Sequence, residues 1–100
     1  MQTDNFIFAK AEGNYCQIHI IKDDKVEMAL LRLTMNQLES QISDKERIFR
    51  CHRSYLINLH HFESVQGNAQ GYKVYLNYER SGIPIARGKS RVFEKLIENL

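Results

Sequence analysis

Hydrophobic and polar residues alternate with a period of two over the first third of the chain. The run from Tyr15 to Lys22 shows this best, with Cys16, Ile18 and Ile20 on one face of an extended segment. Such alternation is typical of a β-strand with one buried face. Turn-forming residues separate this run from an apolar stretch on either side. We therefore expect a three-stranded antiparallel meander over residues 6–9, 15–22 and 26–33.

The pattern then changes to a helical period. Thr34 is followed three residues later by Gln37, which is the spacing of a capping box. The apolar positions at helical spacing are Met35, Leu38 and Ile42. The sequence therefore predicts a short helix that begins after Thr34, packs on the meander and ends in the polar run 43–46.

The second half predicts more strands and one more helix. Strands are expected over residues 62–66, 72–76 and 83–85, with a five-residue hairpin loop over 67–71 because glycine stands at both of its ends. Pro84 confines the last strand to a sheet edge. A polar connection over 87–90 leads to a helix capped by Ser90. Its predicted apolar face consists of Val92, Phe93, Leu96, Ile97 and Leu100.

Composition limits the size and the environment of the fold. With 100 residues, 43% of them hydrophobic, the chain is expected to form a single domain over 1–100. There is no signal-peptide pattern and no apolar run near the length that spans a bilayer, so we expect a cytoplasmic protein with no direct membrane insertion. Cys16 and Cys51 each stand in an apolar run and are predicted to be reduced core thiols.

Basic charge is local rather than general. The net charge is only +2, but residues 1–46 carry a balance of −3 and residues 47–100 a balance of +5. Two stretches contain no acidic residue: Arg50–Asn58, which reads RCHRSYLIN, and the segment from Arg80 to Arg91. Their side chains are donors suited to phosphates and base edges, so they indicate a surface for a polyanion. A solvated surface with chance clustering explains one such stretch about equally well.

Catalysis and metal binding have little support in the sequence. Cys51 and His52 are neighbours on an extended chain and point to opposite faces, so they cannot form a nucleophile–base pair. Cys51 with His60 or His61 stays possible in principle, without an oxyanion hole or a third group. No cysteine or histidine pair has the spacing of a zinc module, and no glycine loop has the nucleotide-binding pattern. We expect no enzyme activity, no metal and no cofactor.

Nucleic-acid binding has positive evidence. Three segments mix side chains that read base edges with side chains that grip phosphates: Glu12–Tyr15, Arg50–Asn58 and Arg87–Arg91. The two predicted helices are far apart, so there is no helix-turn-helix, and no RNP-type aromatic strand is present. A DNA-binding function would therefore depend on loops and strand ends.

Four stretches in order carry a family resemblance. FAKAEGNYCQIH, TMNQLESQI, FRCHRSYLINLHHFESV and IPIARGKSRVFEKLI together span nearly the whole chain. With them the sequence resembles a LytTR domain, the DNA-binding module of AgrA/LytR-type bacterial response regulators. The resemblance implies a mainly β fold, with elongated antiparallel β-sheets and two short helices. It also implies transcription regulation through double-stranded DNA, with loops in successive major grooves and contact to the minor groove between them.

The resemblance also implies which residues meet DNA. They are Asn14 and Tyr15 in the first loop, His52, Arg53 and Ser54 in the second, and Arg87, Lys89, Ser90 and Arg91 in the third. Arg87 is expected to read a guanine and Arg53 to enter the minor groove, while Lys89 and Arg91 grip the backbone. Tyr55, Leu56 and Ile57 are expected to pack in the core. For Asn58, turn stabilisation is favoured over DNA contact.

The family context leaves several features open. Pairs of copies are expected on direct-repeat promoter sites, with possible self-association there. The chain resembles the C-terminal part of a longer regulator, and neither a receiver or sensor domain nor the strand that usually precedes Phe6 is recognisable in it. Two other classes remain as alternatives: a protein-interaction module whose basic strip meets an acidic partner, and a small cysteine or metal enzyme.

Overall fold

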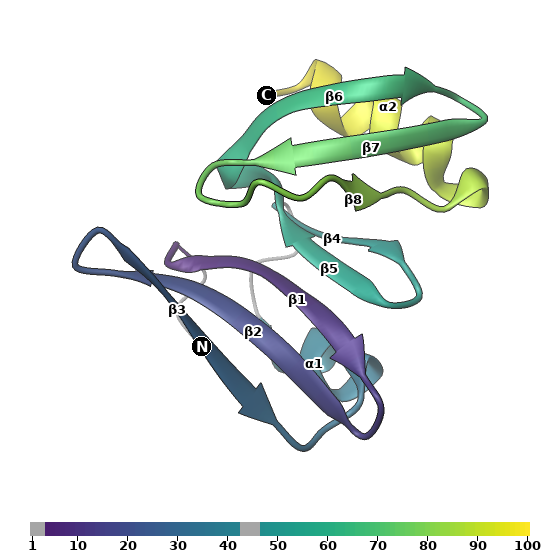
Figure 1. The fold of residues 1–100 in the computed structure, drawn as a ribbon. Helices are drawn as coiled ribbons and strands as arrows, with labels where there is room; N and C mark the ends of the chain where they lie inside the picture. Colours follow the sequence, from purple (N-terminus) through teal and green to yellow (C-terminus); the bar gives the residue numbers. More distant parts are fainter. Residues whose placement is uncertain (1–3, 43–46) are drawn as a thin grey trace.

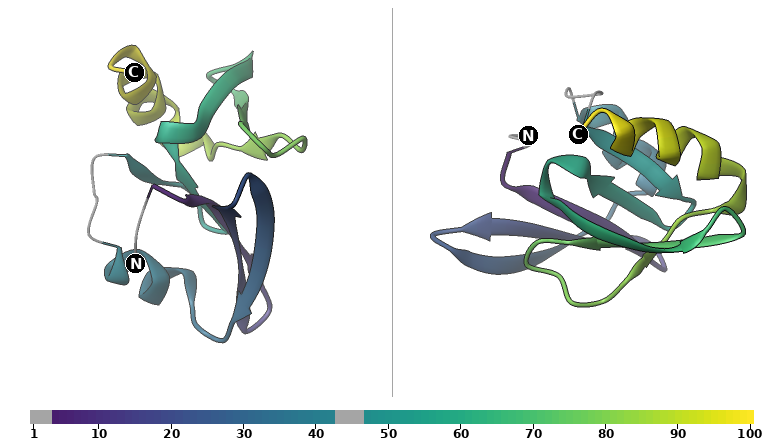
Figure 2. Two further views of the ribbon diagram at one scale, coloured as in Figure 1. Left: turned by 90° about the vertical axis from the view of Figure 1, so that its left-hand side faces the viewer. Right: turned by 90° about the horizontal axis from the view of Figure 1, so that it is seen from above.

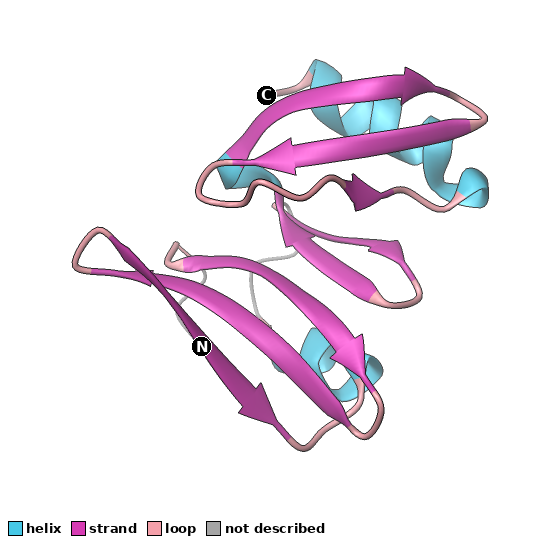
Figure 3. Cartoon of the chain, in the orientation of Figure 1, coloured by secondary structure: helices cyan, strands magenta, loops and turns pink. Residues whose placement is uncertain are grey.

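Eight strands and two α-helices make up the computed structural model, which describes residues 4–42 and 47–100. The strands are β1 Phe6–Glu12, β2 Tyr15–Lys22, β3 Lys25–Leu31, β4 Ile48–His52, β5 Tyr55–Asn58, β6 Phe62–Asn68, β7 Gly71–Leu76 and β8 Ile83–Pro84. The α-helices are α1 Met35–Gln41 and α2 Ser90–Glu98, and the short 3₁₀ helices are η1 Leu59–His61 and η2 Arg87–Lys89. Figure 3 shows that strands dominate the fold, so the prediction of a mainly β protein with two short helices is confirmed.

The strands form two antiparallel sheets. The first has five strands in the order β3-β2-β1-β5-β4, and the second has three in the order β6-β7-β8 (Figure 1). The predicted meander is confirmed as β1–β2–β3, and its second turn places Asp23 and Asp24 at positive φ (52° and 62°). Two consecutive positive φ values are typical of the type I′ turn that suits a two-residue hairpin.

Each sheet face that is covered has its own core. One core lies between the five-stranded sheet and α1, where Met35, Leu38 and Ile42 pack as predicted. The capping box is also confirmed, because Thr34 and Gln37 bond reciprocally across the first turn of α1. The predicted end of this helix in the run 43–46 lies outside the described residues.

The other core joins the two sheets and α2. It includes Ile7 and Ile57 from the five-stranded sheet, Val74 and Ile83 from the three-stranded sheet, and Phe93 from α2. Seen from above, the three-stranded sheet and α2 lie over the five-stranded sheet (Figure 2). The described chain measures 32 × 28 × 24 Å along its principal axes.

Three local predictions are wrong. The β6–β7 loop is shorter than five residues, because pairing continues through Gly67–Tyr72 and Asn68–Gly71. Ser90 is not a cap: it is the first residue of α2, and its hydroxyl donates elsewhere. Of the predicted apolar face of α2, Val92 and Leu100 are exposed to solvent (49% and 51%), since only the turn around Phe93 and the stretch Leu96–Ile97 face the core. The polar connection predicted over 87–90 is not one of these errors, and its first three residues form η2.

No helix within residues 4–42 and 47–100 combines the length and the hydrophobicity that crossing a membrane requires.

Candidate nucleic-acid interface

The three segments singled out in the sequence lie along one edge of the molecule. The β1–β2 turn, the β4–β5 turn and η2 follow one another on the right-hand side of Figure 1. Backbone hydrogen bonds fix the middle segment to both neighbours: Ala11 N–H donates to Ser54 O, and Ala86 N–H donates to Cys51 O, each over 2.8 Å. The two sheets thus bring together loops that are about 35–40 residues apart in the chain.

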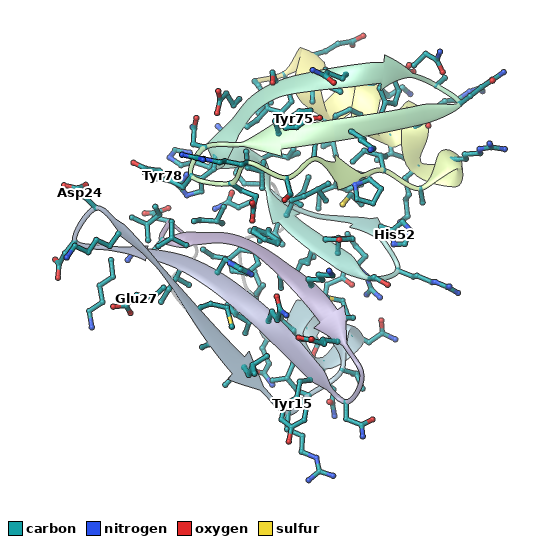
Figure 4. All side chains as sticks on the ribbon, in the orientation of Figure 1. Tyr15, Asp24, Glu27, His52, Tyr75 and Tyr78 are labelled. Carbon is teal, nitrogen blue, oxygen red and sulfur yellow. The ribbon has the colours of Figure 1, made fainter. Side chains whose placement is uncertain are left out.

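The β1–β2 turn forms the first part of this edge. Gly13 adopts φ 58° at its tip, which costs glycine little. Asn14 and Tyr15 follow it on the surface, and Tyr15 leaves 44% of its side chain exposed, at the lower end of the sheet in Figure 4. The acidic Glu12 side chain makes a local hydrogen bond, in which the Gln17 amide donates to its carboxylate.

The β4–β5 turn presents Arg53 to solvent. His52 helps to shape this turn: its Nδ1 accepts from the Ser54 N–H over 3.1 Å, and its ring meets Tyr55 edge-on at 5.9 Å between centroids. With Nδ1 used as an acceptor, the neutral imidazole carries its proton on Nε2. His52 lies beside the turn in Figure 4, half-buried, whereas Arg53 is exposed.

Arg50 has a role that the sequence did not reveal. Its Nε donates to His52 O over 3.0 Å and one terminal nitrogen donates to Arg53 O over 2.7 Å. The other terminal nitrogen contacts Asn36 Oδ1 at 2.8 Å and Glu39 Oε1 at 3.0 Å on α1. Arg50 therefore ties the backbone of the β4–β5 turn to α1. In the sequence it looked like another outward donor of the acid-free run.

The third segment joins η2 to the start of α2. Arg87, Lys89 and Arg91 are all exposed. Arg87 Nε donates to Gln70 O over 3.0 Å, which steadies the side chain and leaves its terminal nitrogens without a partner among the described residues. Those nitrogens are the ones that form a bidentate pair with a guanine.

Ser90 lies differently from the other predicted contact residues. It is 5% exposed, and its hydroxyl donates to Ala69 O in the β6–β7 connection over 2.8 Å. In this position it fixes the start of α2 to the neighbouring hairpin.

The residues predicted to be internal are internal. Leu56 and Ile57 are fully buried, and Tyr55 packs against the core that joins the sheets. Asn58 is 1% exposed; its amide donates to Phe6 O over 2.8 Å, and its oxygen accepts from the His60 N–H over 2.9 Å at the start of η1. The prediction that Asn58 stabilises a turn is therefore confirmed.

The cysteines have the environment of core thiols. Cys16 and Cys51 are free and fully buried. Burial raises the pKa of both thiols above the ordinary value, that of Cys51 to about 12. A thiol with such a pKa stays protonated at neutral pH and is a poor nucleophile. Among residues 4–42 and 47–100 no group of three or more potential ligands could hold a metal ion.

Comparison with known proteins gives a consistent assignment. The fold and its edge define a small β-rich module that presents two basic segments and one polar turn along one side. The sequence model of the family described as LytTr DNA-binding domain matches residues 1–98, so the chain belongs to the LytTR family. No curated protein matches the chain.

One similar solved structure is the LytTr DNA-binding domain of a presumed methyl-accepting/DNA response regulator from Bacillus cereus. The two share a TM-score of 0.75 and 14% sequence identity, over 97% of this chain and 84% of that chain. At this identity the likeness shows a common fold.

Proposed function

We propose that this chain binds double-stranded DNA sequence-specifically through the row of three loops and thereby regulates transcription. Membership of a family of DNA-binding domains supports the partner. The observation that carries the proposal is the joining of three basic or polar segments by backbone hydrogen bonds on one edge. The described chain is 32 Å long, close to the roughly 34–36 Å of one DNA turn.

The proposed binding mode gives each of the three loops its own place on the duplex. Asn14 and Tyr15 would enter one major groove and Arg87 the next, with Arg53 over the minor groove between them. His52 and Ser54 would support that central contact. Lys89 and Arg91, with Ser90 fixing their helix, would meet phosphates and set the register. Direct-repeat promoter sites would then be filled by one copy per repeat.

The decisive experiment is in vitro selection of bound duplexes, followed by titration of alanine variants. We expect Arg87→Ala to cost about 1–3 kcal/mol on the selected site and to relax the base preference at one position. Arg53→Ala should also weaken binding. Arg80→Ala is the matched control, since Arg80 is exposed but lies in the β7–β8 connection at the opposite end of its sheet (Figure 1).

Circular dichroism should show all three variants folded. Equal affinity of wild type, Arg53→Ala and Arg87→Ala would refute the residue assignment. Equal affinity of wild type for the selected and a random duplex at physiological salt would refute sequence-specific binding and favour an acidic protein partner instead. Salt titration adds a further check, because removing a phosphate grip such as Lys89 should lower the salt slope by about 0.9.

A further inference from the structure

The outer strand β3 of the five-stranded sheet is apolar and uncovered. All seven of its residues are exposed, and Val26, Met28 and Leu30 keep 43%, 51% and 53% of their surface in solvent. No other strand of the described residues pairs with its outer edge. Natural edge strands are usually blunted by charges, proline or a bulge. Between Val26 and Leu31 only Glu27 is charged, and pairing with β2 is regular throughout.

The unpaired backbone groups of β3 can be assigned from its register. Lys22 and Lys25 flank the two-residue turn and face each other, so Lys25 and every second residue after it bond to β2. The N–H and C=O groups of Val26, Met28 and Leu30 therefore point to the free edge. The side chains of these three residues also share one face of the sheet, opposite α1, because their β2 partners do.

This edge is complementary to itself. If two β3 strands pair antiparallel about Met28, each Val26 faces the Leu30 of the other copy, and the outward backbone groups of both strands bond each other. The charges at the ends of the strand also match residue by residue: pairing about Met28 sets Asp24 of one copy opposite Arg32 of the other, while Lys22 and Lys25 balance the remaining charge of the turn. The Asp24–Arg32 pair occurs twice, once at each end, which is the self-matching that a two-fold interface requires.

We propose that two copies of this chain associate through β3, joining their five-stranded sheets into one continuous sheet with a two-fold axis at Met28. The predicted DNA loops lie at the end of the sheet where β3 finishes, so the two copies present them at opposite ends of the joined sheet. Such a dimer can hold two separate duplex segments. Binding of one copy to one site does not depend on it, so the two proposals can fail independently.

Sedimentation equilibrium over a wide concentration range tests the association. The mass of the wild type should rise from 11.8 kDa towards about twice that value. Met28→Lys should hold the protein at the monomer mass while leaving its affinity for a single duplex site unchanged. Val92→Lys, which places the same charge at an equally exposed apolar position on α2, should associate like wild type. A wild type that stays monomeric near millimolar concentration, or a Met28→Lys variant that still dimerises, overturns the proposal.

Disulfide trapping tests the register. In the proposed pair the two copies of residue 28 face each other at about 5.5 Å between Cα atoms, within disulfide range. Met28→Cys should therefore cross-link readily under mild oxidation. Val26→Cys is the control on the same strand and face, because its two copies would lie about 13–14 Å apart. The native cysteines are buried and should not compete. Equal cross-linking of both variants would exclude pairing about Met28.

Discussion

Cys51 stands at the junction of the two sheets. Its sulfur lies 3.6 Å from Pro84 O and 3.9 Å from Tyr55 O, and its own carbonyl accepts from the Ala86 N–H. The side chain is fully buried. Desolvation is the main reason that its pKa is raised to about 12, although nearby Arg50 and Lys89 favour the thiolate. One small residue thus helps to set the distance between the β4–β5 turn and the segment that leads to Arg87.

This burial predicts a loss of stability in alkali. The unfolded thiol ionises near its ordinary pKa of 9.0, whereas the folded thiol holds its proton to about 12. The contribution of Cys51 is therefore complete below pH 9 and declines as pH rises from 9 to 12, by at most about 1.4 kcal/mol per pH unit. Urea unfolding of wild type and Cys51→Ala between pH 7 and 10.5 measures this as a difference between the two proteins. That difference should be constant to pH 9 and shrink above it; a constant difference up to pH 10.5 would contradict the prediction.

At the scale of elements, the β4–β5 hairpin depends on α1 for its shape. Arg50 donates to two carbonyl oxygens of the turn and to two acceptors on the helix. These hydrogen bonds fix the loop that carries Arg53 to α1. A guanidinium can do this because its donors are held in one plane in a fixed arrangement, which a lysine ammonium cannot reproduce.

Replacing Arg50 should therefore affect both stability and DNA binding. We expect Arg50→Ala to lower the free energy of unfolding by about 2 kcal/mol, with a smaller loss for Arg50→Lys. DNA affinity should fall, while the slope of its salt dependence stays at the wild-type value. The reason is that the Arg50 guanidinium makes internal hydrogen bonds and does not contact phosphates. Urea unfolding and salt titration measure the two effects, with Arg80→Ala as the exposed-arginine control. A reduced salt slope for Arg50→Ala would instead mean that Arg50 contacts DNA.

Strand β2 and the side chain of Arg50 show what the sequence could predict and what it could not. Alternation predicted β2 to the residue, because burial of Cys16 and Ile18 on one face leaves only one register. The acid-free runs indicated which segments form the edge. The inward turn of Arg50 could not be predicted, since an arginine has the same donors whichever way it points, and its direction depends on the position of α1.

Predictions from single residue types also failed at two positions, where strand pairing or a tertiary hydrogen bond decided the local structure. Glycine at both ends of 67–71 predicted a loop, yet Gly67 sits inside the ladder at φ 94° and faces Tyr72. Glycine with positive φ occurs in irregular strands as well as in turns, so the presence of glycine alone could not distinguish a strand from a loop here. Ser90 likewise has the side-chain chemistry of a helix cap, but its hydroxyl donates a hydrogen bond to the nearby Ala69 carbonyl instead.

At the scale of the whole molecule, one core joins the two sheets. Phe93 on α2 is fully buried, stacks on Phe49 of β4 at 6.3 Å and meets Tyr72 of β7 at 5.4 Å between ring centroids. The loops of the candidate interface belong to both sheets. Their spacing is therefore set by this shared core rather than by either sheet alone.

Because that core is shared, the two sheets should unfold as one cooperative unit. Phe93→Leu and Phe6→Leu are a matched pair, each changing a fully buried phenylalanine, one in the core between the sheets and one in the core under α1. Each should cost about 1–2 kcal/mol. Native-state hydrogen exchange should then show the slowest amides of β1 and β7 losing protection by the same amount in either variant. If Phe93→Leu weakened only β7 and Phe6→Leu only β1, the sheets would be separate folding units, and the spacing of the DNA loops would have to be fixed by the Ala86–Cys51 hydrogen bond and its neighbours instead.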